Sequence, residues 1–256
     1  MTLFNAKQSK IQGYLYITAK DDIKLFQASI GSKFIKSDRK PPWLVVNHSL
    51  DGIIVTEWPG RLLKVEILDG VNEMDLNKGL VKDVWYTRTL GVEILEVVPT
   101  QALFEPNGVE IVQILDFISE MSEEAVNKLN QFELKNASKI YSNAWNEWLK
   151  MKDVNSIHMN QDHSNTLAIY ANNSRATMNR SFSVISNLVW KRAKSVLGDS
   201  AFTVDEDGEL VLNARWSHAT DALLHAAMAM HGRDFISNED KIELWNPWNS
   251  LITNEK

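Results

Sequence analysis

Apolar residues in the first 105 positions fall into short runs, and several of these runs alternate with polar residues. Leu63, Val65 and Ile67 alternate with Lys64 and Glu66, which is the period of a half-buried strand. Turn-forming pairs that contain glycine separate the runs. The pattern predicts strands over residues 13–17, 43–46, 53–56, 63–67, 85–90 and 92–98, with a β-bulge at Gly91.

Helical periodicity replaces this pattern after Pro106-Asn107-Gly108. Apolar spacing predicts helices over residues 109–118, 137–151, 182–196 and 214–231, with the last one buried. Ser122 is expected to cap a further short helix, since acidic residues follow it. The turn at Asp207-Gly208 predicts a β-hairpin between residues 202–204 and 210–212. The aromatic segment 244–248 is too short for a helix by itself, and we expect it either to lie over the core or to anchor a partner.

These elements together predict an α+β fold. We expect a β-rich N-terminal domain over residues 1–106. A mostly helical domain with one β-hairpin is expected over residues 107–256. No flexible linker divides the two regions, so one core shared by both is an open alternative.

The composition narrows the possible chemistry. The chain of 256 residues has no cysteine, which excludes disulfide bonds, thiol nucleophiles and cysteine-ligated metals. Its 33 acidic and 27 basic residues give a net charge of −6, which disfavours a nucleic-acid partner. No run of about 18 apolar residues occurs, so we expect no membrane partner and a cytoplasmic location. The usual phosphate-loop, dinucleotide-binding, zinc-protease and serine-hydrolase motifs do not occur either.

Five segments of the N-terminal region follow one another in a familiar order and spacing. They are residues 15–23 (Leu-Tyr-Ile-Thr-Ala-Lys-Asp-Asp-Ile), 44–52 (Leu-Val-Val-Asn-His-Ser-Leu-Asp-Gly), 61–66 (Arg-Leu-Leu-Lys-Val-Glu), 75–77 (Asp-Leu-Asn), and 85–88 (Trp-Tyr-Thr-Arg) running into 92–94 (Val-Glu-Ile). In these segments the region from about residue 12 to residue 105 resembles the small rifampin-type ADP-ribosyltransferases. The resemblance implies an ADP-ribosyltransferase-like sheet domain with a cleft for NAD.

The resemblance also implies a set of site residues. In such enzymes a histidine anchors the ribose, an aromatic ring stacks on the nicotinamide, and an acid stabilises the positive charge that develops. The histidine position falls on Ile17, which cannot hydrogen-bond a ribose hydroxyl. The aromatic position falls near Val45, with Trp43 two residues away, and the acid corresponds to Asp75. A shifted register would instead combine Trp43 with His48.

Two hypotheses follow from these departures. In the first, the chain is a non-catalytic binding protein on a degenerate scaffold of this type, because function depends on the site and not on the fold. Its partner would be another protein, it would need no cofactor, and it would act as an accessory, immunity or anti-defence factor in bacteria or phages. The alternative is an active NAD-dependent ADP-ribosyltransferase, with Asp75, Tyr86 and Arg88 as catalytic residues and with Trp43 and His48 binding NAD.

A second alternative comes from the helix predicted over residues 214–231. His218, Asp221 and His225 stand at positions i, i+3 and i+7, which places them on one helix face. Histidine and carboxylate side chains are ligands of zinc and iron, so a metal-dependent enzyme is conceivable. Three residues form only a partial ligand set, and Arg215 nearby opposes a cation. A hydrogen-bonded polar stripe without a metal is the favoured interpretation.

Overall fold

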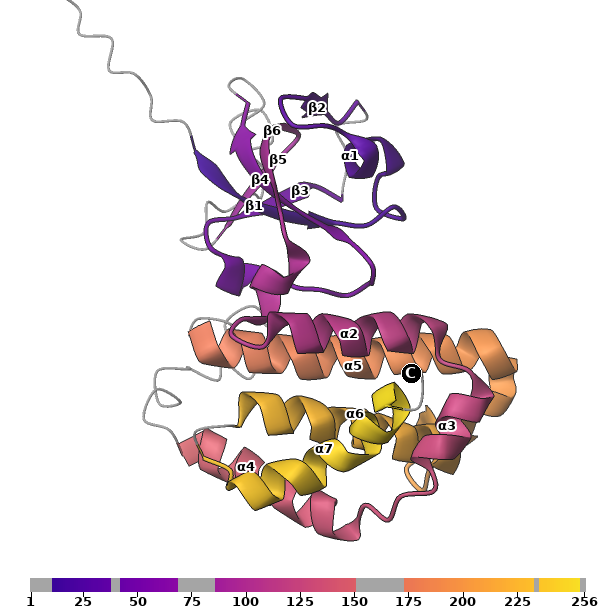
Figure 1. Cartoon of the computed structure of the whole chain (residues 1–256). Coiled ribbons are helices and arrows are strands. Elements are labelled where there is room, and N and C mark those ends of the chain that lie inside the picture. Colours follow the sequence, from indigo (N-terminus) through magenta and orange to yellow (C-terminus); the bar gives the residue numbers. More distant parts are fainter. Residues whose placement is uncertain (1–10, 38–41, 69–85, 151–172, 233–234, 254–256) are drawn as a thin grey trace, which may run out of the picture. The chain divides into compact units, whose positions relative to one another are not determined.

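The computed structural model describes residues 11–37, 42–68, 86–150, 173–232 and 235–253 of the chain (Figure 1). Its strands come first and its helices dominate afterwards, which confirms the expected α+β class. The described residues form two compact units. The sheet unit consists of residues up to Ile54 together with Gly60–Ala102, and the helical unit consists of Val55–Pro59 together with the residues from Leu103 onward.

The sheet unit contains one antiparallel sheet of six strands and one short helix. Its elements are β1 (Gln12–Ile17), α1 (Ile23–Gln27), β2 (Lys33–Ile35), β3 (Leu44–Asn47), β4 (Arg61–Ile67), β5 (Tyr86–Thr89) and β6 (Gly91–Val98), with a 3-10 turn at Leu50–Gly52. The strands lie in the order β2-β6-β4-β1-β3-β5. Only Leu90 separates β5 from β6, yet β5 pairs with β3 and β6 pairs with β4 and β2. The chain therefore bends at Leu90 and changes partners.

Strand alternation gives the sheet two chemically different faces. The inner face is aliphatic, and its core residues are Leu15, Ile17, Leu44, Val46, Leu63, Val65, Ile67, Val92 and Ile94, together with Leu25 of α1. The opposite face, called the outer face below, carries the alternate residues of each strand. Asp22 begins α1 by accepting hydrogen bonds from the Lys24 and Leu25 amides at 2.9 Å and 3.0 Å.

Two details of the predicted strands are wrong. Residues 53–56 form no strand, although Ile53 and Val55 are buried and Ile54 between them is exposed. This segment is extended, and its side chains are alternately buried and exposed, which gives the same sequence pattern as a strand. Burial of side chains does not require a hydrogen-bonded neighbouring strand, so the pattern alone is not sufficient. Gly91 opens β6 and pairs with Ile35. The irregularity lies further along, where β4 shifts register between Lys64 and Val65.

The helical unit consists of six helices and a β-hairpin within the described residues. They are α2 (Gly108–Glu120), α3 (Glu123–Leu129), α4 (Lys135–Lys150), α5 (Asn173–Leu197), β7 (Phe202–Val204), β8 (Leu210–Leu212), α6 (Ala214–His231) and α7 (Asn238–Thr253), with 3-10 turns at Thr100–Phe104 and Gly198–Ala201. The Ser122 hydroxyl accepts from the Ala125 amide at 3.2 Å, which confirms the expected cap of α3. Gly198, with φ of 59°, follows α5 directly.

Helix α6 is the centre of the helical unit. It packs against α3, α4, α5 and α7, while α2 lies along α5 (Figure 1). Its residues from Ala222 to Met230 are buried except for a half-buried Leu224, as the apolar composition of this stretch predicts. Asn213 caps α6 by accepting from the Trp216 amide at 3.1 Å.

The prediction for the aromatic C-terminal segment is partly wrong. Residues 244–248 are helical and form the middle of α7, with Pro247 inside the helix. Leu244, Trp248 and Leu251 are buried at helical spacing, so tertiary burial of this stripe outweighs the cost of the proline. The expectation that the segment lies over the core is confirmed, because α7 packs against α6.

A segment from the middle of the sheet region belongs to the helical unit. Val55 is buried there, and the Trp58 indole nitrogen donates to Asp116 Oδ1 of α2 at 2.7 Å. Lys191 of α5 donates to the Thr56 carbonyl at 3.0 Å and forms an ion pair with Glu57. None of the described helices has both the length and the apolar character needed to cross a bilayer.

Candidate functional site

The sheet unit brings most of its predicted site residues to the outer face. In the β3–β5 pairing, Val45 lies opposite Arg88 and Asn47 lies opposite Tyr86. Tyr86 and Arg88 are both half-buried, whereas Thr87 and Thr89 between and beyond them are buried on the inner side. Val45 remains 39% exposed, and alternation places Trp43, which precedes β3, on the same side.

The outer face also contains an aromatic residue that the sequence analysis did not select. Tyr14 of β1 lies opposite Asn47, so a row of Tyr14, Asn47 and Tyr86 crosses three neighbouring strands. The alternation of Tyr14 with the apolar Leu15 indicates that Tyr14 points to the outer face. That Tyr14 lies beside the predicted site depends on the order of the strands, which the alternation does not give. Tyr14, Trp43, Val45, Tyr86 and Arg88 are called the aromatic patch below.

Tyr86 and Arg88 form a contact within the aromatic patch. The Arg88 guanidinium carbon lies over the Tyr86 ring at 5.5 Å from its centroid. Such a cation–π contact stabilises by about 0.5–1 kcal/mol at a site that is in part exposed. The contact holds two long side chains in one arrangement before any partner arrives, which lowers the entropy cost of binding.

His48 and the predicted acid are not part of the patch as described. His48 Nε2 and Thr87 Oγ1 share a hydrogen bond of 2.9 Å, and Thr87 points to the inner side. The imidazole is therefore directed to the face opposite Tyr86 and Arg88. Asp75 and Trp85 lie outside the described residues.

Ile17 occupies the position at which the resemblance implies a ribose-binding histidine. Its side chain is 3% exposed and belongs to the aliphatic core of the sheet. A hydrocarbon in this position offers no hydrogen bond to a sugar. The neighbouring Asp21 carboxylate accepts from the Thr18 amide at 2.9 Å and from the Thr18 hydroxyl at 2.7 Å, so it stabilises the local turn.

The three metal candidates on α6 lie in different surroundings. His218 Nε2 lies 3.0 Å from the Phe132 carbonyl oxygen, so this nitrogen carries a proton and donates it. His225 is 3% exposed and packs against the Tyr141 ring at 5.2 Å between centroids. Asp221 is exposed. Within the described part of the chain, no three histidine, aspartate or glutamate side chains are arranged to hold a metal ion.

Burial controls the protonation of this helix face. It lowers the pKa of His225 from 6.5 to about 4, and the nearby His218 acts in the same direction. It also raises the pKa of Tyr141 to about 12, with the Asp221 carboxylate adding to the effect. At neutral pH the arrangement is thus a neutral imidazole beside a protonated phenol. An imidazole with so low a pKa is a weak general base at pH 7.

A serine–histidine contact was missed by the sequence analysis. His231 Nε2 and Ser181 Oγ are 2.8 Å apart, within the reach of a nucleophile and its base. Burial lowers the pKa of His231 from 6.5 to about 4, and Ser181 is fully buried. A substrate cannot reach a hydroxyl in that position, so the contact joins α6 to α5 and is not an active site. No sequence motif marks it, because the two residues are on different helices.

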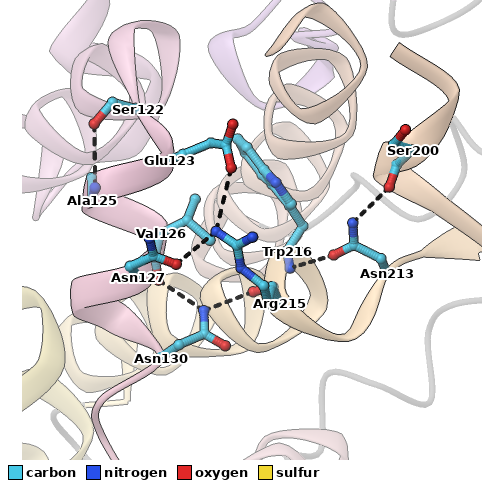
Figure 2. A network of polar contacts seen from close by, with 10 residues as sticks. All are labelled: Ser122, Glu123, Ala125, Val126, Asn127, Asn130, Ser200, Asn213, Arg215 and Trp216. Atoms are coloured by element: carbon cyan, nitrogen blue, oxygen red, sulfur yellow. Dashed lines mark hydrogen bonds and ion pairs between the residues drawn. The ribbon is translucent and has the colours of Figure 1, made fainter. Parts of the chain in front are cut away.

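Figure 2 shows the polar network in which Arg215 takes part, at the junction of α3 and α6. Arg215 Nη2 donates to Asn127 Oδ1 at 2.6 Å and lies 3.4 Å from Glu123 Oε2. Asn130 Nδ2 donates to the Arg215 carbonyl at 2.9 Å and to the Val126 carbonyl at 2.8 Å. The guanidinium is thus engaged with α3, and the network fixes the first turn of α6.

Comparisons of the chain with protein-family models, curated proteins and solved structures gave no match. The function must therefore be argued from the chemistry of the chain itself. Within the described residues, the aromatic patch is the strongest candidate for a functional site, since it joins exposed apolar surface with a positioned cation.

Proposed function

We propose that the protein is a non-catalytic, cytoplasmic binding protein and that the aromatic patch of the sheet unit contacts another protein. The single observation that carries this proposal is the composition of the patch. Tryptophan, tyrosine and arginine are the residues most enriched at the energetic centres of protein interfaces. Here Tyr86 and Arg88 share one face of the paired strands β3 and β5, and Trp43 directly precedes β3.

The surroundings of the patch favour binding over NAD chemistry. Ile17 is in the core, and His48 is hydrogen-bonded to Thr87, so neither is presented on the outer face. An ADP-ribosyltransferase needs groups that recognise the sugar and stabilise the cationic transition state. The positive charge of Arg88 opposes a developing positive charge, and Asp75, the acid that the resemblance implies, lies outside the described residues. The role as an accessory, immunity or anti-defence factor remains part of the proposal.

The other half of the outer face provides a contrast. There Lys33 of β2 and Glu93 of β6 form an ion pair at 3.6 Å, and Gln12 donates to Glu66 at 3.2 Å. These polar groups already have partners within the sheet. We therefore place the contact with the partner on the β1–β3–β5 half of the face.

The first experiment separates a binding protein from an enzyme. Titration calorimetry of the full chain with NAD is expected to show no heat of binding. Micromolar binding of NAD that is lost in Arg88→Ala, together with release of nicotinamide, would contradict the proposal and establish the transferase alternative.

The second experiment tests the patch. The wild type, the Tyr86→Ala/Arg88→Ala double variant and Lys33→Ala are used in parallel to isolate partners from the source cells. A partner retained by the wild type is then titrated against all three proteins. We expect the double variant to bind at least about tenfold more weakly and Lys33→Ala to bind like the wild type. Equal affinities for all three would refute the role of the patch.

A further inference from the structure

The β-hairpin of the helical unit exposes apolar surface that the rest of the unit does not cover. Strand β7 pairs with β8, so that Phe202 lies opposite Leu212 and Val204 lies opposite Leu210. Both pairs are on the same side of the ribbon, because they are two residues apart along each strand. Val204 is 68% exposed and Leu210 is 55% exposed, whereas Phe202 and Leu212 are half-buried.

The base of the hairpin is anchored firmly. The Phe202 ring packs on Trp190 of α5 with 4.3 Å between centroids. Asn213, which follows β8, donates its backbone amide to the Ala201 carbonyl at 2.8 Å. Its side chain donates to the Ser200 carbonyl at 2.9 Å (Figure 2). The apolar stripe on this side therefore begins in the packed part of the unit and continues beyond it into solvent.

The tip of the hairpin is also ordered. Asp205 Oδ1 accepts from the Asp207 and Glu209 amides at 3.0 Å and 2.8 Å, and Gly208 has φ of 83°. A hairpin with a fixed base and a fixed turn presents its exposed pair in one conformation. Binding then requires little ordering of the chain.

Charge indicates which occupant this surface fits. The residues beside the exposed pair include four acids, all exposed: Asp205, Glu206, Asp207 and Glu209. In the part of the chain that the structure describes, no lysine or arginine forms an ion pair with them. An apolar pair flanked by four negative charges is complementary to an apolar surface flanked by lysine and arginine.

A second copy of the chain fits less well. The chain has a net charge of −6, so two copies repel each other. Two of the three basic residues near the end of α5 are engaged within the unit, because Lys191 pairs with Glu57 and Arg192 donates to the Met121 carbonyl at 2.8 Å. A basic partner is therefore favoured over self-association.

We propose that the β7–β8 hairpin is a docking element for a basic protein surface and that Val204 and Leu210 form its apolar contact. This inference is independent of the aromatic patch, because the hairpin belongs to the helical unit and its variants leave Tyr86 and Arg88 unchanged. The exposed pair supplies affinity through burial of apolar area, and the acidic turn supplies the preference for a basic partner.

The test uses the full chain and a display library of random dodecapeptides. Selection on the wild type, with removal of binders to the Val204→Ser/Leu210→Ser variant, is expected to enrich peptides that combine lysine or arginine with apolar residues. The affinity of a selected peptide should fall about tenfold when salt is raised from about 50 mM to about 500 mM, since screening weakens exposed charge pairs. Amide chemical shifts should change within residues 202–212.

Three further variants keep the test decisive. Leu210→Ser is expected to weaken peptide binding at least about fivefold, and Glu206→Lys/Glu209→Lys to weaken it about tenfold. Ile242→Ser, which changes an isoleucine on α7 that is 71% exposed, should leave the affinity unchanged. Circular dichroism and amide spectra establish that every variant is folded.

Other outcomes would overturn the proposal. The proposal fails if the selected peptides are acidic or purely apolar, or if the library yields no binder that depends on the hairpin. It also fails if amide chemical shifts change only outside the hairpin. A dimer in sedimentation that dissociates in Leu210→Ser would assign the surface to a second copy. Loss of binding in Tyr86→Ala/Arg88→Ala with normal binding in Leu210→Ser would assign the contact to the aromatic patch alone.

Discussion

The two units differ in how completely their buried polar groups are hydrogen-bonded. In the sheet unit, buried polar side chains have partners: Thr89 Oγ1 lies 3.2 Å from the Gly91 amide and carbonyl, and Thr87 Oγ1 is hydrogen-bonded to His48. In the helical unit, two buried ring nitrogens have no hydrogen-bond partner among the described residues: Trp216 Nε1 and His225 Nδ1. An unsatisfied buried polar group costs about 1–3 kcal/mol.

The difference follows from the side chains that each architecture uses. A sheet core of leucine, isoleucine and valine brings few polar atoms inside. A helix bundle filled with tryptophan and histidine gains large buried area, but a rigid ring places its nitrogen wherever the ring fits. The helical unit thus gains stability from buried aromatic area while some of its buried ring nitrogens make no hydrogen bond within the described part of the chain. It should therefore be more sensitive to truncation of rings and to acid.

The largest expected effect is the loss of a buried ring. Trp248 is 1% exposed and meets Phe117 edge-on at 5.2 Å between centroids. Trp248→Ala should lower the free energy of unfolding of the helical unit by about 3–5 kcal/mol. Trp248→Phe should cost less than about 1.5 kcal/mol, since it keeps a large aromatic ring in the same place.

Hydrogen exchange during denaturant titration measures this prediction for each unit. Protection of α6 amides should fall in Trp248→Ala, while protection of β4 amides should not. Equal losses in both elements would mean that the two units unfold as one. A phenylalanine variant as unstable as the alanine variant would show that the indole nitrogen contributes.

The next effect is acid sensitivity. The pKa of His225 is about 4 in the folded chain, against 6.5 as its ordinary value. Above pH 6.5 both the folded and the unfolded states hold a neutral imidazole. Between pH 6.5 and pH 4 the unfolded state binds the proton first, so stability falls as the pH falls, by a total on the order of 3 kcal/mol.

His225→Phe removes this linkage. The variant should match or exceed the wild type at pH 7, because Nδ1 has no partner in the described structure. Its advantage over the wild type should grow to about 3 kcal/mol at pH 4. Urea unfolding at several pH values, followed through helical circular dichroism, measures the difference. A constant difference between the two proteins at every pH would refute the role of His225.

The smallest of these effects concerns the sheet unit, where backbone proximity limits substitution. A methyl group at Gly13 would meet the Asn47 carbonyl oxygen at 2.4 Å and a Val46 methyl group at 2.7 Å. Gly13→Ala should therefore force β1 and β3 apart and cost about 1–3 kcal/mol. Val45→Ala on the outer face is the control, with an expected cost below about 1 kcal/mol.

Amide exchange of β1 and β3 reports the Gly13→Ala effect directly. If the comparison between the units is correct, helical amides keep their protection in this variant. Unchanged protection in β1 would show that the strands can adjust without cost. Weaker partner binding in the same variant would connect the spacing of β1 and β3 to the aromatic patch.

Local patterns were enough to predict most elements. Helix α6 begins and ends where the apolar periodicity does, Ser122 caps α3, and Asp207-Gly208 forms the turn of the hairpin. These features depend on neighbours in sequence. The five residues around Pro247 do not by themselves predict helix α7. The helical spacing becomes visible only over the longer segment from Leu244 to Leu251, which contains the buried residues Leu244, Trp248 and Leu251.

The arrangement of the site depended on long-range pairing. Alternation alone places Tyr86 and Arg88 on one face, but only the β1–β3–β5 order brings Tyr14 beside them. His48 is hydrogen-bonded to Thr87 and therefore does not lie beside the other described residues of the predicted NAD site. The spacing of residues in the sequence does not indicate this hydrogen bond. The contact of Ser181 with His231 joins residues from two helices, and a sequence carries no local signal for it.

The origin of Val55–Pro59 limits how the molecule can be divided. These residues lie between β3 and β4 in the chain, yet Trp58 and Lys191 bind them to α2 and α5. A fragment that starts at residue 103 would lose the indole that packs against Phe104 and the carbonyl that Lys191 binds. Neither unit is a single continuous segment of the chain. Production of the helical unit alone would therefore require residues 55–59 as a separate peptide or as a grafted loop.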